Sequence, residues 1–395
     1  MQPRFDCQFG LRDLWTAAYS GGNGHADLAH LLPGFEHERL RVIPTLRGRE
    51  ALYLILKSLE LPPGSKIGVP VFTCSVVARV TRAAGMVPVF IDEDSDTYGM
   101  SLPDLEKKVG RLDALVMVHT FGYPHDIDMV EQIMAGKPII GDCAHAVGSS
   151  YKGRALGARA DASLYTFGWR KPLGIGGGGC LTTANEDLAE RIENQIQVSR
   201  QETGREAAAH VLGSVAYAAA FRGVLYSLMT YAFGRGDHDG GRRSSPGRTL
   251  PPERISPELH IRRTDRNLLA SRIQQWHDSR RWVADFWTAV RANASPSWHI
   301  PQEPSWGGWN HFILPFRVAS AVDCTGIIRQ FRKRGVGAAR IYPNCVAETT
   351  ASGYAGDCPV AEQLSQTTFM VPAYPRMSAA ARARVIESIR EISRR

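Results

Sequence analysis

Short runs of apolar residues alternate with helical patterns from about residue 49 onward, and this alternation constrains the fold more than any other feature. The strands are apolar throughout, which is typical of parallel strands buried on both faces. The sequence therefore predicts an α/β domain with a largely parallel sheet between two layers of helices. The expected strands are 66–70, 87–91, 114–119 and 138–141, and the expected helices include 50–59, 75–84 and one capped by Ser101.

A smaller set of elements follows in the last third of the chain. We expect strands at 311–316 and 337–341, a helix at 324–334 and a closing amphipathic helix at 378–392. A chain of 395 residues exceeds what one hydrophobic core usually serves. The prediction is a large domain over residues 1–260 and a small C-terminal α/β domain over 261–395, with the boundary in a loop rich in Pro, Gly and Arg.

Composition excludes several classes of protein. Lys and Arg total 47 against 39 Asp and Glu, and most of the net charge of +8 is dispersed, which argues against a nucleic-acid partner. The seven cysteines are widely spaced and form no C-x-x-C pair, so neither a disulfide framework nor a metal site is predicted. The N-terminal residues lack the basic-then-apolar pattern of a signal peptide, and the expected location is the cytoplasm.

One segment breaks the α/β pattern. Residues 207–233 are almost entirely apolar, and residues 234–255 form a basic, Gly-rich loop. A transmembrane span is rejected, because Arg222 would cost about 3 kcal/mol in mid-span and the two domains would lie on opposite sides of a membrane. Two interpretations stay open: helices buried in the fold or in a dimer interface, and contact with a membrane surface or a lipid ligand through 207–248.

The residues that indicate chemistry lie between 139 and 183. An apolar strand delivers Asp142 at its C-terminal end, where open α/β sheets bind their ligands. A second strand, ASLYTF, ends just before Lys171, which precedes a glycine cluster. This pair suits pyridoxal 5′-phosphate (PLP), because the lysine can form a Schiff base while the aspartate keeps the pyridine nitrogen protonated. Taken singly, Asp142 is also interpretable as a helix cap and Lys171 as a solvated lysine.

The glycine run 174–179 formally satisfies the dinucleotide-binding pattern G-x-G-x-x-G. It runs into the apolar strand CLTT instead of opening a helix, so the context that this motif requires is missing. The phosphate loop G-x-x-x-x-G-K-[ST] and the nucleophile elbow G-x-S-x-G do not occur in the sequence. Of these ligand-binding motifs, the interpretation as a PLP site is the one that stands.

Several segments together resemble the DegT/StrS-type sugar aminotransferases, which are fold type I PLP-dependent enzymes. The resemblance covers most of the chain from residue 48 onward except roughly 200–260. The matching pieces are GREAL (48–52), VPVFT (69–73), AAGMVPVFID (83–92), VHTFGYPHDID (118–128), GDCAHAVGSSYKGRALG (141–157), LYTFGWRKPLGIGGGGCLTT (164–183), IYP (341–343) and CPVAEQLSQTTFMVPAYP (358–375).

The resemblance implies a role for individual residues. Lys171 is expected to bind the cofactor and transfer protons, and Asp142 to pair with the pyridinium nitrogen. Ala144 is expected on one ring face and His145 against the ring and its phenolic oxygen. The amides of Gly48 and Arg49 open a helix whose N-terminus suits a dianionic phosphate. The remaining candidates are Thr166 at the phosphate, Cys74 where the family often has a stacked aromatic residue, His260 in a weak counterpart of the family's N-x-R element, and Arg340 and Tyr342 toward the substrate. Arg340 and Thr166 are also interpretable as structural residues, and His145 as a core histidine.

The functional prediction is a PLP-dependent aminotransferase. The resemblance implies L-glutamate as amino donor, a nucleotide-linked keto-sugar as acceptor and a homodimeric assembly. Two alternatives stay open: transfer to a hydrophobic or lipid-linked ketone at the membrane surface, and a non-catalytic PLP-binding regulatory protein. A dehydratase is disfavoured because relatives of that type lack the lysine.

Overall fold

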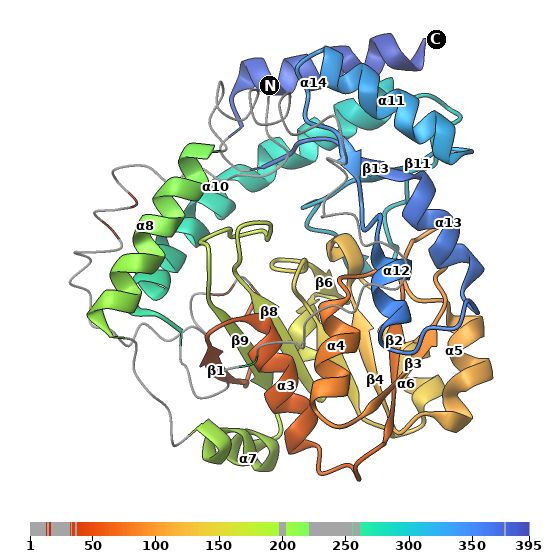
Figure 1. The fold of residues 1–395 in the computed structure, drawn as a ribbon. Helices are drawn as coiled ribbons and strands as arrows, with labels where there is room; N and C mark the ends of the chain where they lie inside the picture. Colours follow the sequence, from red (N-terminus) through yellow and green to blue (C-terminus); the bar gives the residue numbers. More distant parts are fainter. Residues whose placement is uncertain are drawn as a thin grey trace.

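A seven-stranded sheet forms the centre of the predicted large domain (Figure 1). The computed structural model describes residues 13, 16, 32, 34, 35, 38–196, 203–220, 255, 261–374 and 377–394. The strand order is β1-β9-β8-β5-β4-β2-β3. Their bounds are β1 (Arg41–Thr45), β2 (Lys66–Pro70), β3 (Val87–Ile91), β4 (Ala114–Val118), β5 (Ile139–Asp142), β8 (Ala162–Thr166) and β9 (Gly179–Thr183).

Strands β3, β2, β4, β5 and β8 are neighbours in that order within this sheet, and they run parallel to one another. Strand β9 pairs antiparallel with both β8 and β1, so it is the one reversed strand among the seven. The four strands predicted in this half are confirmed, two of them with unchanged bounds. All five residues of β4 and all four of β5 are buried, because helices cover both faces.

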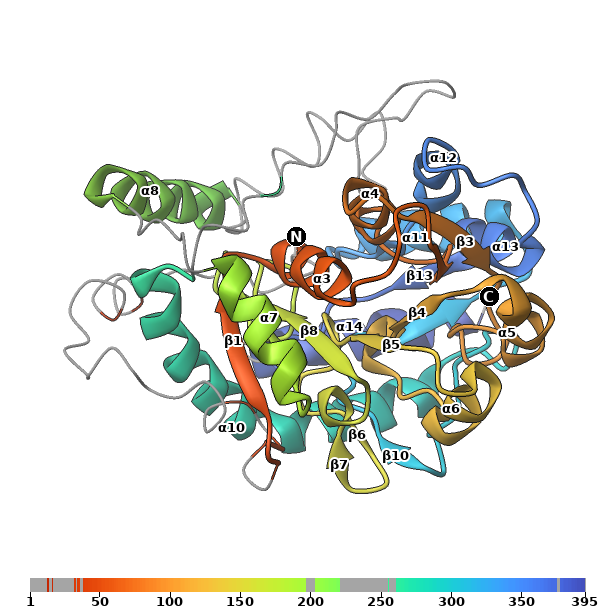
Figure 2. The same ribbon diagram turned by 90° about the horizontal axis from the view of Figure 1, so that it is seen from below.

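Helices cover the sheet on two sides, as predicted (Figure 2). One layer holds α3 (Gly48–Ser58), α4 (Val76–Ala83) and α7 (Glu186–Ile196), and the other holds α5 (Leu102–Lys108) and α6 (Ile127–Met134). Ser101 caps α5, since its side chain accepts a hydrogen bond from the Asp104 amide at 3.3 Å. The described residues also contain three short 3-10 helices and a small second sheet: η1 (Val109–Arg111), η2 (Thr120–Gly122), η3 (Leu156–Ala158), and β6 (Ser150–Tyr151), β7 (Arg154–Ala155) and β10 (Gly307–Gly308).

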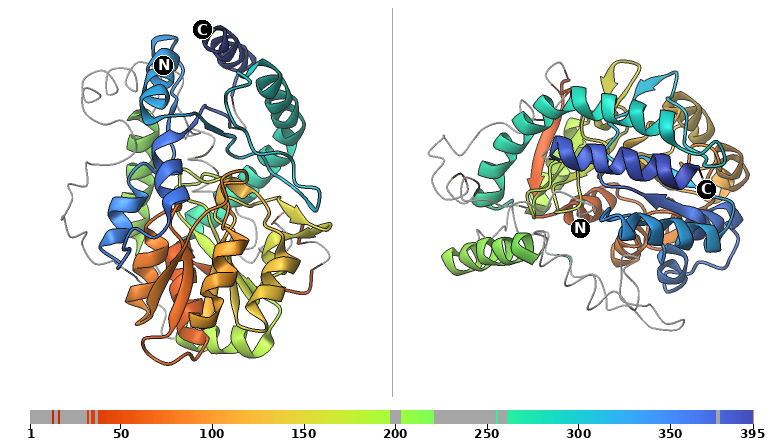
Figure 3. Two further views of the ribbon diagram at one scale, coloured as in Figure 1. Left: turned by 90° about the vertical axis from the view of Figure 1, so that its right-hand side faces the viewer. Right: turned by 90° about the horizontal axis from the view of Figure 1, so that it is seen from above.

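The C-terminal third forms a second lobe (Figure 3). The 31-residue helix α10 (Arg263–Asn293) runs alongside α14 (Ala379–Ser393). A three-stranded sheet in the order β11-β13-β12 lies next to α11 and α13. The bounds are β11 (Pro315–Arg317), β12 (Ala339–Arg340), β13 (Thr368–Met370), α11 (Ala321–Lys333), α12 (Cys345–Thr350) and α13 (Pro359–Thr367). The domain boundary is predicted near residue 260. Residues 256–260 lie outside the described part of the chain.

The strand predicted at 311–316 is wrong in its first four residues. His311 has a φ of +54°, which no strand residue adopts, and its carbonyl accepts a hydrogen bond from Trp287 Nε1 at 2.7 Å. The side chain of Asn310 is also engaged, donating to the carbonyls of His145 and Val147. Residues 311–314 are therefore held in a loop against the large domain, and the strand begins only at Pro315.

The start of the apolar segment is a helix, α8 (Gly204–Ala220), which lies at the edge of the molecule (Figures 1 and 2). Its inner face is anchored by His210, whose Nε2 lies 2.9 Å from Asp265 Oδ1 on α10, and by Tyr217, whose ring stacks on Trp169. Residues 221–233 and nearly all of the basic loop 234–255 lie outside the described residues. No helix in the described ranges combines the length and the apolar character that a membrane crossing needs.

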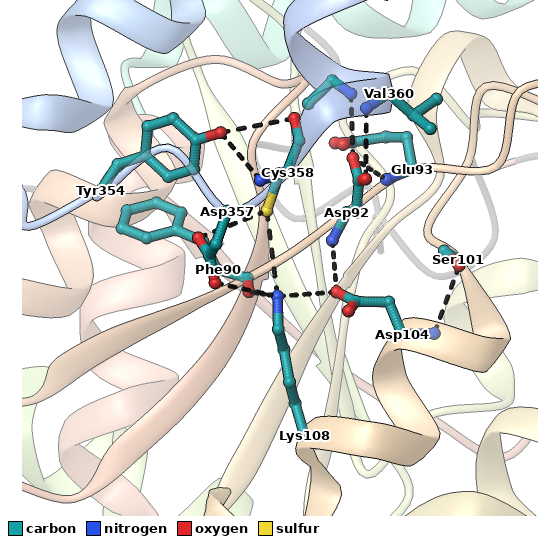
Figure 4. Close-up of polar contacts among 11 residues, drawn as sticks. Phe90, Asp92, Glu93, Ser101, Asp104, Lys108, Tyr354, Asp357, Cys358 and Val360 are labelled. Atoms are coloured by element: carbon teal, nitrogen blue, oxygen red, sulfur yellow. Dashed lines mark hydrogen bonds and ion pairs between the residues drawn. The ribbon is translucent and has the colours of Figure 1, made fainter.

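A buried polar cluster joins the two lobes at β3 and α13 (Figure 4). Asp92 follows β3, and its carboxylate accepts hydrogen bonds from the amides of Val360 (3.2 Å) and Ala361 (2.9 Å) at the start of α13. Beside it, Lys108 Nζ donates to the carbonyl of Phe90 at 2.8 Å and pairs with Asp104 and Asp357. Asp92 thus caps a helix of the other lobe, so the cap also fixes the position of that lobe.

Replacing Asp92 should destabilise the protein strongly. We expect Asp92→Ala to lower the free energy of unfolding by about 2–3 kcal/mol, because the amides of Val360, Ala361 and Glu93 lose a charged acceptor. Asp96→Ala is the matched control: this aspartate lies in the same loop with its side chain 77% exposed, and the expected change is below about 0.5 kcal/mol. Urea unfolding followed by circular dichroism measures both variants, and equal stabilities would contradict the capping role.

Two buried histidines follow β4. His119 is 1% exposed and His125 is 6% exposed, with ring centroids 5.4 Å apart. Burial lowers the pKa of His119 well below its usual value, and the neighbouring His125 lowers it further. Burial also lowers the pKa of His125. The folded protein therefore binds fewer protons at these two sites than the unfolded chain does at mildly acidic pH.

Stability should consequently fall as the pH drops below about 6.5, the usual histidine pKa. Each histidine with a lowered pKa makes the free energy of unfolding decrease by up to about 1.4 kcal/mol per pH unit, and this contribution is fully present above pH 6.5. Urea unfolding at pH 7.5 and 5.5 measures the difference. We expect His119→Gln to reduce the pH dependence and the same change at the exposed His277 to leave it unaltered. An unchanged dependence in His119→Gln would contradict this account.

Candidate active site

Two neighbouring strand ends place the candidate residues at the centre of the large sheet. Asp142 is the last residue of β5, and Thr166 is the last residue of the adjacent parallel strand β8. Asp142 is 7% exposed, and its Oδ1 accepts a hydrogen bond from the Ala144 amide at 2.9 Å. The carboxylate is therefore fixed in orientation at the carboxyl ends of the strands, where parallel sheets bind ligands.

Lys171 lies in the loop that connects β8 to β9. Its amide donates to the carbonyl of Gly168 at 3.0 Å, and the loop returns to the sheet through Gly176, Gly177 and Gly178. Gly178 has a φ of +81°, and a Cβ there would lie 3.0 Å from Ile261. A glycine is needed at this point because the backbone is left-handed and closely covered.

Lys171 and Asp142 line the same cavity, which has a volume of about 320 Å³. The structure therefore brings the two residues singled out in the sequence to one cavity. The cavity is lined by Arg47, Gly48, Arg49, Leu52, Cys74, Val76, Val77, Asp142, Ala144, Leu164, Thr166, Gly168, Lys171, Gly176, Gly177 and Gly178.

Burial and charge act in opposite directions on the two ionisable groups. Desolvation lowers the pKa of Lys171, whereas the nearby Cys74 and Asp142 act to raise it. Desolvation raises the pKa of Asp142, whereas the Lys171 charge and the Ala144 amide act to lower it. An amine with a lowered pKa has a larger unprotonated fraction at neutral pH, which a lysine needs to react with a carbonyl group.

The N-terminus of α3 forms another wall of the cavity. The helix begins at Gly48, and no side chain at the preceding residue caps its first amides. A Cβ at Gly48 would lie 2.8 Å from the Cβ of Thr166, so a larger residue would not fit between the helix and β8. Arg49 and Thr166 line the cavity on this side. A helix N-terminus, a guanidinium and a hydroxyl together favour an anion such as phosphate.

These residues fit PLP. A buried carboxylate, an amine and an anion-binding helix end surround one cavity, and they match the pyridine nitrogen, the aldehyde and the phosphate of that molecule. Cys74 and Ala144 line the same space, and the Cys74 side chain is exposed. A thiol at Cys74 offers no aromatic ring for stacking at this position.

His145 and Tyr342 lie in an aromatic cluster next to Asp142. Their rings are nearly parallel, with centroids 6.4 Å apart, and Phe121 stacks on Tyr342 from 6.3 Å. His145 Nδ1 accepts a hydrogen bond from the Phe121 amide, and burial lowers the pKa of this histidine well below its usual value. Neither ring is among the described residues that line the cavity. Contact of His145 with a bound cofactor stays a prediction, and so does a substrate contact of Tyr342.

Arg340 lies away from the cavity. Its guanidinium donates to the Ala321 carbonyl at 3.0 Å and to Thr325 Oγ1 at 2.7 Å, both on α11. This placement favours the structural role over the carboxylate-binding one. His260 lies outside the described residues. Arg262, two residues further on, packs against Gly177 of the glycine loop and lies 3.7 Å from Asp265.

Several residues that line the cavity were not predicted from the sequence. Arg47 precedes the predicted Gly48–Arg49 pair directly, and a second arginine at a helix start was a usable indication of an anion site. Val76 and Val77 reach the cavity from the first turn of α4, and Leu52 from α3. These apolar residues could not be recognised as cavity residues from the sequence, because residues at ordinary core positions follow the same apolar pattern.

The architecture and the site define the fold type I class of PLP-dependent transferases. An aminotransferase, TlmJ from Streptoalloteichus hindustanus, superposes with a TM-score of 0.73 at 22% identity, covering 99% of this chain and 98% of that one. The PLP form of a sugar aminotransferase described as putative, Spr1654 from Streptococcus pneumoniae, gives a TM-score of 0.75 at 19% identity, covering 99% and 98%. At these identities the likeness establishes the fold.

The chain belongs to the DegT/DnrJ/EryC1/StrS aminotransferase family, which matches residues 22–218 and 269–390. The family named in the sequence analysis is thereby confirmed. The interruption from 219 to 268 contains most of the apolar segment and all of the basic loop, which sets this part of the chain apart from the family pattern.

Two relatives have names that refer to nucleotide-linked sugars. GDP-perosamine synthase of Escherichia coli O157:H7 is 33% identical over 147 residues, which is 36% of this chain and 40% of that protein. The UDP-N-acetyl-3-dehydro-alpha-D-glucosamine 3-aminotransferase of Acidithiobacillus ferrooxidans is 34% identical over 149 residues, which is 37% of this chain and 40% of that protein. Each of these matches thus spans about two fifths of the relative's length.

Proposed function

We propose that this protein is a PLP-dependent aminotransferase that moves an amino group from L-glutamate to a nucleotide-linked keto-sugar. The observation that carries the proposal is the shared cavity of Lys171 and Asp142, with the α3 N-terminus forming its third wall. Family membership and the names of the relatives support the choice of a sugar acceptor. In the net reaction the donor's amine replaces the ketone oxygen of the acceptor, and the donor leaves as its 2-oxo acid.

Each wall of the cavity has a role in this proposal. PLP supplies an electron-withdrawing ring that stabilises negative charge next to the reacting carbon. Asp142 holds the ring nitrogen protonated, because its carboxylate is fixed by the Ala144 amide and faces the cavity. Lys171 would hold the cofactor, and its amine, once displaced by the substrate, would accept and donate a proton beside the reacting carbon. Gly48, Arg49 and Thr166 bind the phosphate.

The half-reaction with glutamate tests the proposal. Purified protein is loaded with PLP, and a single turnover with L-glutamate is followed by absorbance and by release of 2-oxoglutarate. We expect conversion of the bound cofactor to its pyridoxamine form with one equivalent of product. A protein that binds PLP but converts no amino acid would be a binding protein and not a transferase. Subsequent addition of keto-sugar nucleotides should return the original spectrum.

The exposed face of α8 favours one alternative acceptor, a hydrophobic or lipid-linked ketone. Leu212 is 69% exposed, and its neighbours on this face are small apolar residues. Contact of this face with a membrane would bring the cavity near such a substrate. Flotation with anionic liposomes tests the alternative: Leu212→Glu should reduce recovery, whereas Val322→Glu, at an 80% exposed apolar position on α11, should not. Equal recovery of all three proteins would exclude it.

A further inference from the structure

Arg47 presents an exposed guanidinium at the rim of the cavity. Its main chain is fixed, since its carbonyl accepts hydrogen bonds from Thr45 Oγ1 at 3.0 Å and from the Ala51 amide at 3.3 Å. The backbone also forms a bridge to Gly178. Among the described residues, no side chain pairs with the guanidinium. A cation on a fixed backbone is therefore available to a ligand.

Arg47 and Arg49 are not equivalent, although both line the cavity. Arg49 is half-buried within the first turn of α3 and follows Gly48, which packs closely on Thr166, whereas Arg47 is exposed and precedes the helix. The helix end, Arg49 and Thr166 already provide amides, a charge and a hydroxyl for one phosphate. The charge of Arg47 is thus in excess of what the cofactor's phosphate requires.

The location of Arg47 restricts which part of a substrate it can reach. The reacting carbon has to lie beside Lys171, at the floor with the buried Asp142. An exposed residue at the rim reaches groups that are remote from that carbon. An amino acid such as glutamate carries its charges within a few bonds of the reacting carbon, whereas a nucleotide-linked keto-sugar carries a diphosphate beyond its sugar ring.

We propose that Arg47 binds the diphosphate of the acceptor and so selects nucleotide-linked sugars. This inference rests on the proposed aminotransferase function. The planar guanidinium forms paired hydrogen bonds with phosphate oxygens, which an ammonium group cannot reproduce. Arg47 is accordingly a specificity-determining residue for the second half-reaction, and Arg49 belongs to the cofactor.

The affinities for nucleotide and for PLP distinguish the role of Arg47 from that of Arg49. The dissociation constants of UDP and GDP for the PLP-loaded protein are measured by calorimetry, and that of PLP by equilibrium titration of the apoprotein. In Arg47→Gln we expect the preferred nucleotide to bind about 10- to 100-fold more weakly, while PLP affinity changes less than about threefold. Arg49→Gln should show the reverse pattern. Arg47→Lys should recover only part of the loss, and the difference between wild type and Arg47→Gln should shrink at high salt.

Several results would overturn the proposal without affecting the aminotransferase function. These are equal nucleotide affinity in wild type and Arg47→Gln, no nucleotide binding by the wild type, or a loss of PLP affinity in Arg47→Gln as large as that in Arg49→Gln. A failure of the function itself is seen separately, because the wild type would then not convert bound PLP with L-glutamate, a reaction that involves no nucleotide.

Discussion

Lys171→Ala should abolish the visible absorption of lysine-bound PLP and slow the glutamate half-reaction by at least about 10³-fold. The variant lacks both the amine that attaches the cofactor and the base that moves the proton, and a positioned acid–base group alone contributes about 10²- to 10⁴-fold. Burial lowers the pKa of this lysine, which suits both tasks. Stopped-flow absorbance after addition of L-glutamate measures the rate.

The matched control is Lys57→Ala, since Lys57 is exposed on α3 outside the cavity. We expect its spectrum and rate to equal those of the wild type. Thermal melting of the apoproteins checks that Lys171→Ala is folded. A folded Lys171→Ala protein that converts glutamate within tenfold of the wild-type rate would remove Lys171 from the chemistry.

Asp142→Asn should slow the same half-reaction by about 10³-fold, the size of effect seen when one fixed electrostatic group is removed from an active site. Asparagine retains the shape and can accept the hydrogen bond from the Ala144 amide, but it carries no charge to hold the ring nitrogen protonated. Single-turnover rates, with the dissociation constant of PLP measured in parallel, report the effect.

Stability distinguishes this catalytic role from a structural one. Desolvation raises the pKa of Asp142 in the folded protein, so its charged form costs free energy at neutral pH, above the usual aspartate pKa. The apoprotein of Asp142→Asn should therefore be at least as stable as the wild type. A large loss of stability together with an unchanged rate would show that Asp142 maintains the fold and not the reaction.

Much of the large domain could be predicted from the sequence, because its strands are short apolar runs between clear helical patterns. Strands β2 and β3 have the predicted bounds. The 311–316 prediction failed because an apolar run does not reveal tertiary contacts: Asn310 and His311 are held by hydrogen bonds to residues distant in the sequence. The predicted 337–341 strand is reduced to Ala339–Arg340.

The candidate site was predictable to a similar degree. Asp142 and Lys171 could be placed because each follows a recognisable strand, and parallel strands end at the same edge. Arg340 could not be placed, since its partners on α11 become neighbours only through folding. The exposure of Arg47 was likewise not predictable, because the sequence does not show which of the two arginines that flank Gly48 faces solvent.

Chemical trapping of the cofactor tests the central claim most directly. The PLP-loaded protein is reduced with borohydride, digested and mapped by mass spectrometry, so that a lysine joined to the cofactor carries a permanent mass increase. The account predicts one modified peptide, with the increase on Lys171, and none after prior conversion with L-glutamate. A modification on a different lysine, or a loaded protein with Lys171 unmodified, would contradict it.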